Sequence, residues 1–309
     1  MNNSGTARAS GWLEFFNRNR VREAVEAYIL ILPTVLGLLI FTLGPILASL
    51  YFSFTNWNLL SAPKWRGLDN YIELFTKDPL FWTTLKNTAY YVLGTVPTGT
   101  ILALLLAIAL NQKIKGLAIF RTIYFIPVVS SVVAISVLWS FLYQADFGLI
   151  NQALRALGFK GVGWLSSPTW AMPAVIIMSI WHGLGYNIVI FIAGLQSIPQ
   201  DYYEAARIDG ANAWQNFHHI TLPLISPVTF FVITLSLIAS FQVFEQAYVM
   251  TQGGPVNATK TIVYYLYQNG FMNFHMGYAS AIAYILFLII VVLTLFQFSL
   301  QRRWVHYEL

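Results

Sequence analysis

The chain has 309 residues, of which 57% are hydrophobic and only 9% are charged; its net charge is +5 and it contains no cysteine. A mean hydropathy of +0.63 excludes an ordinary soluble globular protein and is typical of a membrane protein. The Lys and Arg residues are scattered singly, which argues against nucleic-acid binding, and the lack of cysteine excludes disulfides and cysteine-based catalytic or metal sites.

Residues 1–26 are polar and of mixed charge, and they lack the early apolar run and small-residue cleavage site of a signal peptide. We expect this segment to be a cytoplasmic tail. Trp12, Phe15 and Val21 could lie on one face of an interfacial helix, and a loosely ordered tail is an equal alternative.

A helix needs roughly 20 mainly apolar residues to cross a bilayer. Six charge-poor segments meet this requirement, at approximately residues 27–52, 88–110, 123–142, 171–195, 224–245 and 278–300. Pro33 and Pro45 predict kinks in the first of them. The sequence therefore predicts an all-α, polytopic membrane protein with one transmembrane domain over residues 27–301.

The distribution of basic residues predicts the orientation of these spans. The link between the second and third spans holds Lys113, Lys115 and Arg121, and Arg302 and Arg303 follow the last span. The positive-inside rule places both segments on the cytoplasmic side, and an even number of spans then puts both termini there, with residues 302–309 as a second tail.

Three polar segments would lie on the outer side. A short surface helix is expected within residues 56–86, and another within residues 144–169. The third segment, residues 250–276, opens with Gly253-Gly254-Pro255, which is a strong turn signal.

Residues 201–222 form a polar interval within an otherwise apolar part of the chain. No Asp, Glu, Lys or Arg occurs from Gly161 to Gln200 or from Gly210 to Phe244. Asp201 could cap a short helix after Pro199, and Gly210 would end it in a left-handed conformation. We call residues 201–222 the elbow.

The second limb of the elbow would begin at Asn212 with Gln215, in the spacing of a capping box, and Pro223 and Pro227 would limit it and kink the following span. The first limb would expose the small residues Ala205 and Ala206, so that a partner's cleft could close around them. Glu204 and Arg207 would be available for ion pairs at its rim. From the physics alone, an ordinary amphipathic interfacial loop remains an equal alternative.

The elbow resembles the EAA loop of permeases in binding-protein-dependent ABC importers. The matching pattern is Glu204-Ala205-Ala206-x-x-Asp209-Gly210-Ala211, followed by Phe217, Ile220, Leu222-Pro223 and Pro227. In that family the loop is a coupling helix seated in a separate ATP-hydrolysing subunit. The resemblance therefore implies a type I ABC importer permease fold and assigns coupling to Glu204, Ala205, Ala206, Arg207, Asp209 and Gly210.

Further motifs resemble carbohydrate-type permeases, in the branch of the maltose and glycerol-phosphate permeases, from about Leu32 to Arg302. They include residues 67–71, Asn87-Thr88, residues 121–127, Gly148 with Asn151, and Thr251 with Gly253-Gly254-Pro255. The extra N-terminal spans and the large periplasmic insertion of the maltose permease are missing here, so maltose is not carried over as the solute.

The resemblance also implies partners and a location. These are a second, different permease, two copies of an ATPase subunit that hold ATP and magnesium, an external solute-binding protein, and membrane lipid. The expected location is a bacterial or archaeal cytoplasmic membrane. A sugar, oligosaccharide or glycosyl-polyol is the expected solute, and glycerol-3-phosphate or a related polyol phosphate is the alternative.

Polar residues within spans are candidates for solute contacts, because they cost free energy unless they line a cavity or find partners. Glu245 stands at the outer end of the fifth predicted span, near Ser240, Gln242 and Gln246. Carboxylate and amide groups could bond several sugar hydroxyls. A helix-end carboxylate that faces water or pairs with a partner subunit is an equally good interpretation of Glu245.

The fourth predicted span contains Trp181, His182, Gly183, Tyr186 and Asn187. Aromatic rings stack on pyranosides and Asn bonds hydroxyls, although aromatic residues in membrane helices more often serve packing. The resemblance implies sugar-contacting positions near His182, Gly183 and Tyr186, and on the fifth span near Ser236, Ser240 and Val243. Of these, Gly183, Tyr186 and the two serines retain the chemistry of the family.

No metal site is expected, because His182, His218 and His219 lack suitably spaced companions. The chain also lacks a phosphate loop, an HExxH motif and a GxSxG motif, so we expect it neither to hydrolyse ATP nor to be an enzyme. A secondary transporter is a remaining rival, although the internal repeats and ion-site residues of that class are not evident.

Overall fold

The computed structural model describes residues 6–112 and 116–305. Residues 1–5, 113–115 and 306–309, which include parts of both predicted tails as well as Lys113 and Lys115, lie outside the described residues. The described chain is mainly helical, with only two strands of two residues each, in agreement with the predicted all-α class. Its long helical elements are α1 (Thr6–Leu38), η1 (Leu39–Leu43), α2 (Gly44–Ser53), α4 (Pro79–Leu110), α5 (Leu117–Val129), α6 (Val132–Leu142), α8 (Ala171–Ser197), α12 (Ser226–Phe241) and α15 (Met276–Gln301).

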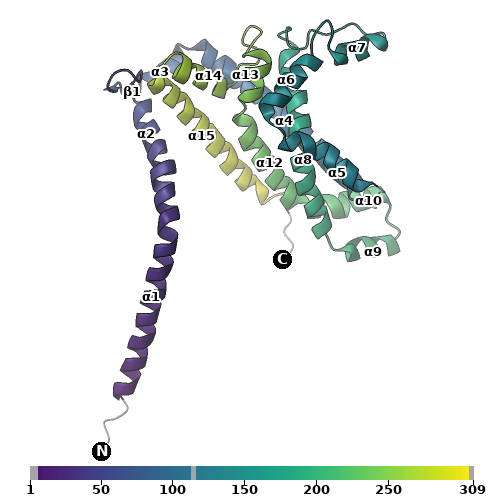
Figure 1. Ribbon diagram of the computed structural model, residues 1–309. Coiled ribbons are helices and arrows are strands. Elements are labelled where there is room, and N and C mark those ends of the chain that lie inside the picture. The colour runs from purple at the N-terminus through teal and green to yellow at the C-terminus, as the bar shows by residue number, and fades with distance from the viewer. Residues whose placement is uncertain (1–5, 113–115, 306–309) are drawn as a thin grey trace, which may run out of the picture.

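The short elements occupy the two ends of the helix bundle (Figure 1). At the elbow end are α9 (Gln200–Ile208), α10 (Ala213–Asn216), η2 (Phe217–Thr221) and α11 (Leu222–Leu224). At the far end are β1 (Thr55–Asn56), β2 (Lys64–Trp65), α3 (Asp69–Thr76), α7 (Leu149–Ala156), α13 (Glu245–Thr251), α14 (Ile262–Tyr267) and η3 (Gln268–Met272). The predicted short helices within residues 56–86 and 144–169 are therefore confirmed as α3 and α7.

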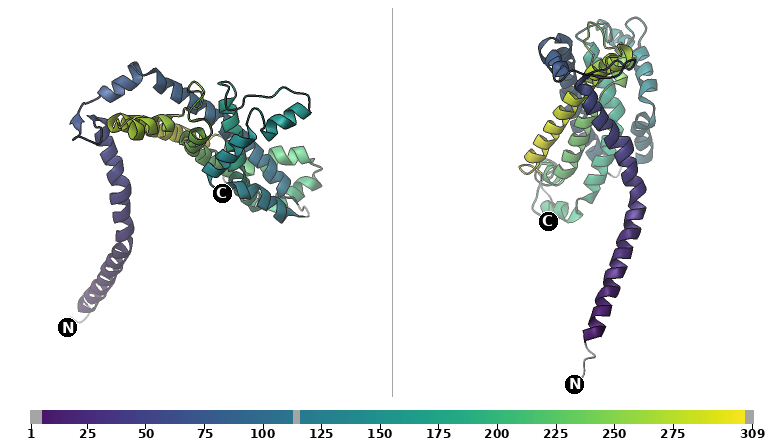
Figure 2. Two further views of the ribbon diagram at one scale, coloured as in Figure 1. Left: turned by 45° about the horizontal axis from the view of Figure 1, so that its top comes forward. Right: turned by 90° about the vertical axis from the view of Figure 1, so that its left-hand side faces the viewer.

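The first predicted span is part of one long helical run that begins at Thr6 and includes most of the predicted tail. Pro33 lies inside α1, and the π-helical turn η1 precedes Pro45. The run from Arg20 to Ser53 buries none of its most apolar window. Helix α1 stands away from the rest of the chain (Figure 2), whereas α2 at the end of the run packs against α15. The apolar side chains of this run, such as Leu30 and Phe41, therefore remain for lipid or another subunit to cover.

The third predicted span, residues 123–142, is not one straight helix. It is a pair, α5 and α6, whose axes are bent by 110° at a break on Ser130 and Ser131. Pro127 withdraws one backbone donor near the end of α5, and the Ser130 hydroxyl donates a hydrogen bond to the carbonyl of Ile126 while its own backbone is extended. The prediction of a continuous span here was wrong.

The fifth predicted span ends earlier than expected. Helix α12 stops at Phe241, and Glu245 begins the separate short helix α13. At its other end, α12 is bent by 63° from the second limb of the elbow, with the break at Ile225 and Pro227 in the first turn of α12. The predicted kink is confirmed, but Glu245 and Gln246 do not continue the α12 helix.

Helices α4, α8 and α12 form the centre of the bundle, with α15 and α5 packed beside them. One apolar cluster, around Ile188, Phe191 and Ile225, fills the space between α4, α8 and α12 toward the elbow. A second, around Phe81 and Ile282, joins α4 to α14 and α15 at the far end. These clusters hold the two ends of the central helices and leave the space between them for the candidate site.

Candidate functional site

The first limb of the elbow is α9. Pro199 precedes it with an extended backbone, and no side chain caps its N-terminus. The prediction that Asp201 caps this helix was wrong, because Asp201 lies within the first turn. Its carboxylate there still interacts favourably with the positive end of the helix dipole. The helix ends at Ile208 with Asp209 as its C-cap, and Gly210 has φ +78°, as predicted for a left-handed terminus.

The second limb begins with the predicted capping box. The backbone N–H of Gln215 donates to Asn212 Oδ1 at 3.0 Å, and the backbone N–H of Asn212 donates to Gln215 Oε1 at 2.8 Å. The hydroxyls of Tyr203 and Thr221 are hydrogen bonded at 3.0 Å, which ties the first limb to the second. The angle between the limbs is therefore fixed by contacts within the chain.

The elbow presents a surface that nothing in the described chain covers. Glu204, Ala205 and Arg207 are exposed, and Ala206 is half-buried. Within the described residues, the ion pairs found do not include Glu204 or Arg207. Both charges are therefore available to a partner at this end of the molecule.

Two apolar side chains extend this surface. Ile208 is 87% exposed and Trp214 is 70% exposed. Neither was predicted as a docking residue, although a large apolar side chain in a polar interval between spans is a readable signal. Their exposure indicates that the covered area in an assembly would include both limbs of the elbow.

A cavity of about 560 Å³ lies between α4, α8, α12 and α13, in the middle of the helix bundle. All of the predicted solute-contacting residues except Trp181 line it. These are His182, Gly183, Tyr186, Asn187, Ser236, Ser240, Gln242, Glu245 and Gln246. The volume is within the usual range for small-ligand sites.

Hydrogen bonds across the cavity join its walls. Asn187 Nδ2 on α8 lies 3.5 Å from Ser236 Oγ on α12, and Thr95 Oγ1 on α4 lies 3.3 Å from Ser240 Oγ. The side-chain oxygen of Gln246 is buried without a hydrogen-bond partner. The cavity wall therefore carries polar groups that a hydroxyl-bearing molecule could satisfy.

Trp181 does not line the cavity. Its ring lies 5.5 Å from the ring of Trp139 on α6, so it serves packing between α6 and α8. His182 lies 3.5 Å from the carbonyl of Ser130 at the break between α5 and α6. In the part of the chain that is described, no group of three His, Asp or Glu side chains could hold a metal ion.

Sequence reasoning missed the contribution of α4 to this cavity. Tyr91, Thr95 and Gly99 follow one another at four-residue spacing, and with Ser179 on α8 they add to the lining. Spacing of this kind places residues on one helix face, and a polar face inside a span is a signal that could have found them.

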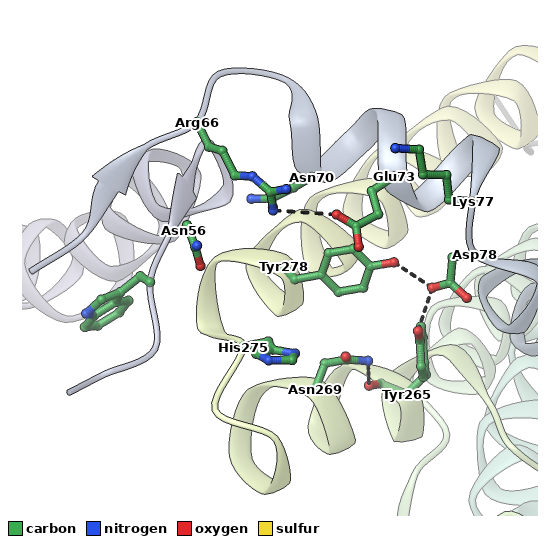
Figure 3. Close-up of a pocket in the computed structure, with 11 residues that line it drawn as sticks. Asn56, Arg66, Asn70, Glu73, Lys77, Asp78, Tyr265, Asn269, His275 and Tyr278 are labelled. Atoms are coloured by element: carbon green, nitrogen blue, oxygen red, sulfur yellow. Dashed lines mark hydrogen bonds and ion pairs between the residues drawn. The ribbon is translucent and has the colours of Figure 1, made fainter. Parts of the chain in front are cut away.

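A second cavity, of about 410 Å³, lies at the far end, between α3, α14 and the start of α15 (Figure 3). Its lining is strongly polar and includes Arg66, Glu73 and His275. Tyr265 and Tyr278 both point toward Asp78, at its edge (Figure 3). This cavity shares no lining residue with the central one, and sequence reasoning did not predict it.

Residues 96–306 match the family described as the binding-protein-dependent transport system inner membrane component. The chain belongs to this family. It is thus a multi-pass permease component of an ABC transport system, with the type I importer fold that the elbow pattern implied.

Named relatives match nearly end to end. The chain is 37% identical to the arabinooligosaccharides transport system permease protein AraP of Bacillus subtilis, over 96% of this chain and 93% of that protein. It is 36% identical to the lactose transport system permease protein LacF of Rhizobium radiobacter, over 90% of this chain and 95% of that protein. It is 34% identical to the sn-glycerol-3-phosphate transport system permease protein UgpA of Yersinia pestis, over 91% and 95%.

A solved structure has the same fold. A chain of a bacterial ABC transporter that imports the acidic polysaccharide alginate is similar with a TM-score of 0.82 and 26% identity, covering 92% of this permease and 98% of that chain. The same transporter in complex with a periplasmic protein bound to alginate pentasaccharide gives a TM-score of 0.81.

Proposed function

We propose that this permease forms half of the membrane pathway of an ATP-driven importer for a sugar, an oligosaccharide or a glycosyl-polyol. One observation carries the proposal: the central cavity and the elbow are built on the same packed helices. The central cavity presents hydroxyl and amide groups between α4, α8 and α12, and the elbow continues directly into α12 with an uncovered surface.

The elbow would be the surface that contacts the ATPase subunit. A cleft on an ATPase subunit would receive Ala205 and Ala206 and pair with Glu204 and Arg207, while ATP and magnesium would be held on that subunit. Closure of an ATPase dimer would move the elbow, and the tie between Tyr203 and Thr221 would pass the motion to α12 as a rigid-body displacement. The cavity would then open outward, and hydrolysis would reset it.

The other partners are inferred from the exposed apolar surface of this chain and from the names of its relatives. A second, different permease would complete the pathway, and the exposed run from Arg20 to Ser53 offers apolar surface for it and for lipid. An external solute-binding protein would deliver the solute at the far end, as supported by the neighbour solved with a periplasmic protein. Both termini would lie in the cytoplasm.

Two alternatives remain. The relative named for sn-glycerol-3-phosphate supports a polyol phosphate importer by the same mechanism. A secondary transporter would need no ATPase and would leave the uncovered elbow without a role.

The test is ATP hydrolysis by the reconstituted assembly. The permease is purified in nanodiscs alone, and then together with a second permease and an ATPase subunit. We expect hydrolysis only in the full assembly, raised further by a solute-loaded binding protein. Solute uptake into vesicles by the permease alone, driven by an ion gradient, would overturn the proposal in favour of a secondary transporter.

A further inference from the structure

The central cavity carries a single formal charge. Among the side chains that line it, only Glu245 is charged at neutral pH; the other polar groups are hydroxyls, carboxamides and the imidazole of His182. No lysine or arginine is among them. The cavity wall formed by this chain is therefore net negative.

Glu245 is not neutralised within the chain. It is an exposed residue at the start of α13, and the ion pairs of the described residues do not include it. The nearest basic residue along the described chain is Lys260, which is nearly buried and has its ammonium group 5.8 Å from the centre of the Tyr264 ring. Within the described residues, no lysine or arginine therefore forms an ion pair with this carboxylate.

A carboxylate in this position acts on charged and neutral molecules differently. At an effective dielectric constant of about 20, a unit charge roughly 12 Å away changes the local concentration of a monovalent ion by about tenfold. Solvent ions screen the charge of this exposed carboxylate in part, so the effect is largest at low ionic strength. A neutral polyol is not repelled, and its hydroxyls can donate hydrogen bonds to the carboxylate.

We infer that Glu245 is a specificity-determining residue that excludes anionic solutes, so that the cavity takes neutral, hydroxyl-rich molecules and disfavours those that carry phosphate or carboxylate groups. The statement about solutes rests on the proposed function; the negative potential does not. The solutes named for the alginate importer and for the relative of Yersinia pestis are anions, which is the class of solute that this cavity would disfavour.

The absence of cysteine from the whole chain allows a direct test. Ser240→Cys places one thiol in the cavity wall, and the variant is assembled with its second permease and ATPase. The thiol is labelled with three methanethiosulfonate reagents of similar size: cationic trimethylammonioethyl, neutral hydroxyethyl and anionic sulfonatoethyl. Each rate is divided by the rate for a free thiol in solution. The ratio of the cationic to the anionic rate cancels any change in thiolate fraction.

With Glu245 present, we expect the cationic reagent to exceed the anionic one by at least about tenfold, with the neutral reagent between them. In the Glu245→Gln background the ratio should fall to about one, and in the Glu245→Lys background it should invert. Ser61→Cys, an exposed position at the far end, is the matched control, and its ratio should not respond to Glu245→Gln.

A ratio near one with Glu245 present would overturn the inference, because charges from other subunits would then neutralise the cavity. A high ratio that survives Glu245→Gln would also overturn it. The labelling needs no transport, so a failure of ATP-driven uptake would refute the proposed function and leave this result standing.

Discussion

The Tyr278 hydroxyl donates a hydrogen bond to Asp78 Oδ2 at 2.6 Å, although the two residues are 200 positions apart. The same oxygen accepts from the Tyr265 hydroxyl at 2.5 Å. The other carboxylate oxygen caps α4 by accepting from the amides of Leu80 and Phe81. One carboxylate therefore joins the first turn of α4 to α14 and α15 at the far end of the bundle (Figure 3).

Asp78→Ala should destabilise the permease by ~2–4 kcal/mol, because it removes a helix cap and leaves two half-buried hydroxyls without an acceptor. In a thermal unfolding scan of the assembly we expect the midpoint to fall by about 5 °C. Asp146→Ala removes an exposed carboxylate and is the control, with little change expected. Equal midpoints for the two variants would show that Asp78 does not hold these helices together.

Stability at high pH should depend on Tyr265. Burial, followed by its bond to Asp78, raises the pKa of Tyr265 from 10.0 to about 12. Between these values the folded chain holds a proton that the unfolded chain has lost, so stability is full below pH 10 and falls as the pH rises toward 12. Tyr265→Phe should make the denaturant midpoint fall less steeply over this range. An unchanged slope would contradict the account.

Glu204→Ala combined with Gly210→Pro should abolish uptake while the helices remain inserted. Proline cannot adopt the φ of +78° found at Gly210, so the turn between the limbs would be lost. Gly158→Pro, which disturbs a similar left-handed turn after α7 at the other end, is the control for strain alone. Co-purification with the ATPase should be lost only in the elbow variant. Normal uptake by the double variant would refute the role of the elbow.

Gly185→Ala should weaken packing between α8 and α5 by ~1–3 kcal/mol. A Cβ atom at this position would overlap the backbone carbonyl oxygen of Tyr124, which cannot move without the helix. Gly183→Ala is the matched control, since a Cβ there meets nothing within 4 Å. The yield of folded protein by size-exclusion chromatography should fall for Gly185→Ala only. Equal yields would mean that the helices can separate at little cost.

Helix-capping residues, glycines and prolines in the sequence predicted the parts of this fold that are determined locally. The capping box at Asn212 and the left-handed Gly210 depend on residues that are near one another in the chain, so their spacing was sufficient. The long apolar runs also located four single-helix candidate spans, and the third and fifth predicted spans fall on bent helix pairs. The EAA pattern supplied the family before any tertiary contact was known.

Breaks inside apolar runs could not be predicted in the same way. The run from Ile123 to Leu142 carries no charge, and hydropathy does not register a bend at Ser130, although Pro127 is a local signal within it. The end of α12 at Phe241 is similarly hidden. Assigning Trp181 to the cavity failed because the face of a helix that meets a cavity depends on its neighbours, and Trp139 comes from a different helix.

Photo-crosslinking from the elbow tests the central claim most directly. The photoreactive residue p-benzoylphenylalanine replaces Ala205, and membranes that contain the native assembly are irradiated. Leu60, which is 88% exposed at the far end, is the control position. We expect the Ala205 position to crosslink to a subunit that binds ATP and the Leu60 position not to do so. A crosslink from Ala205 to an external protein, or to lipid alone, would contradict the account.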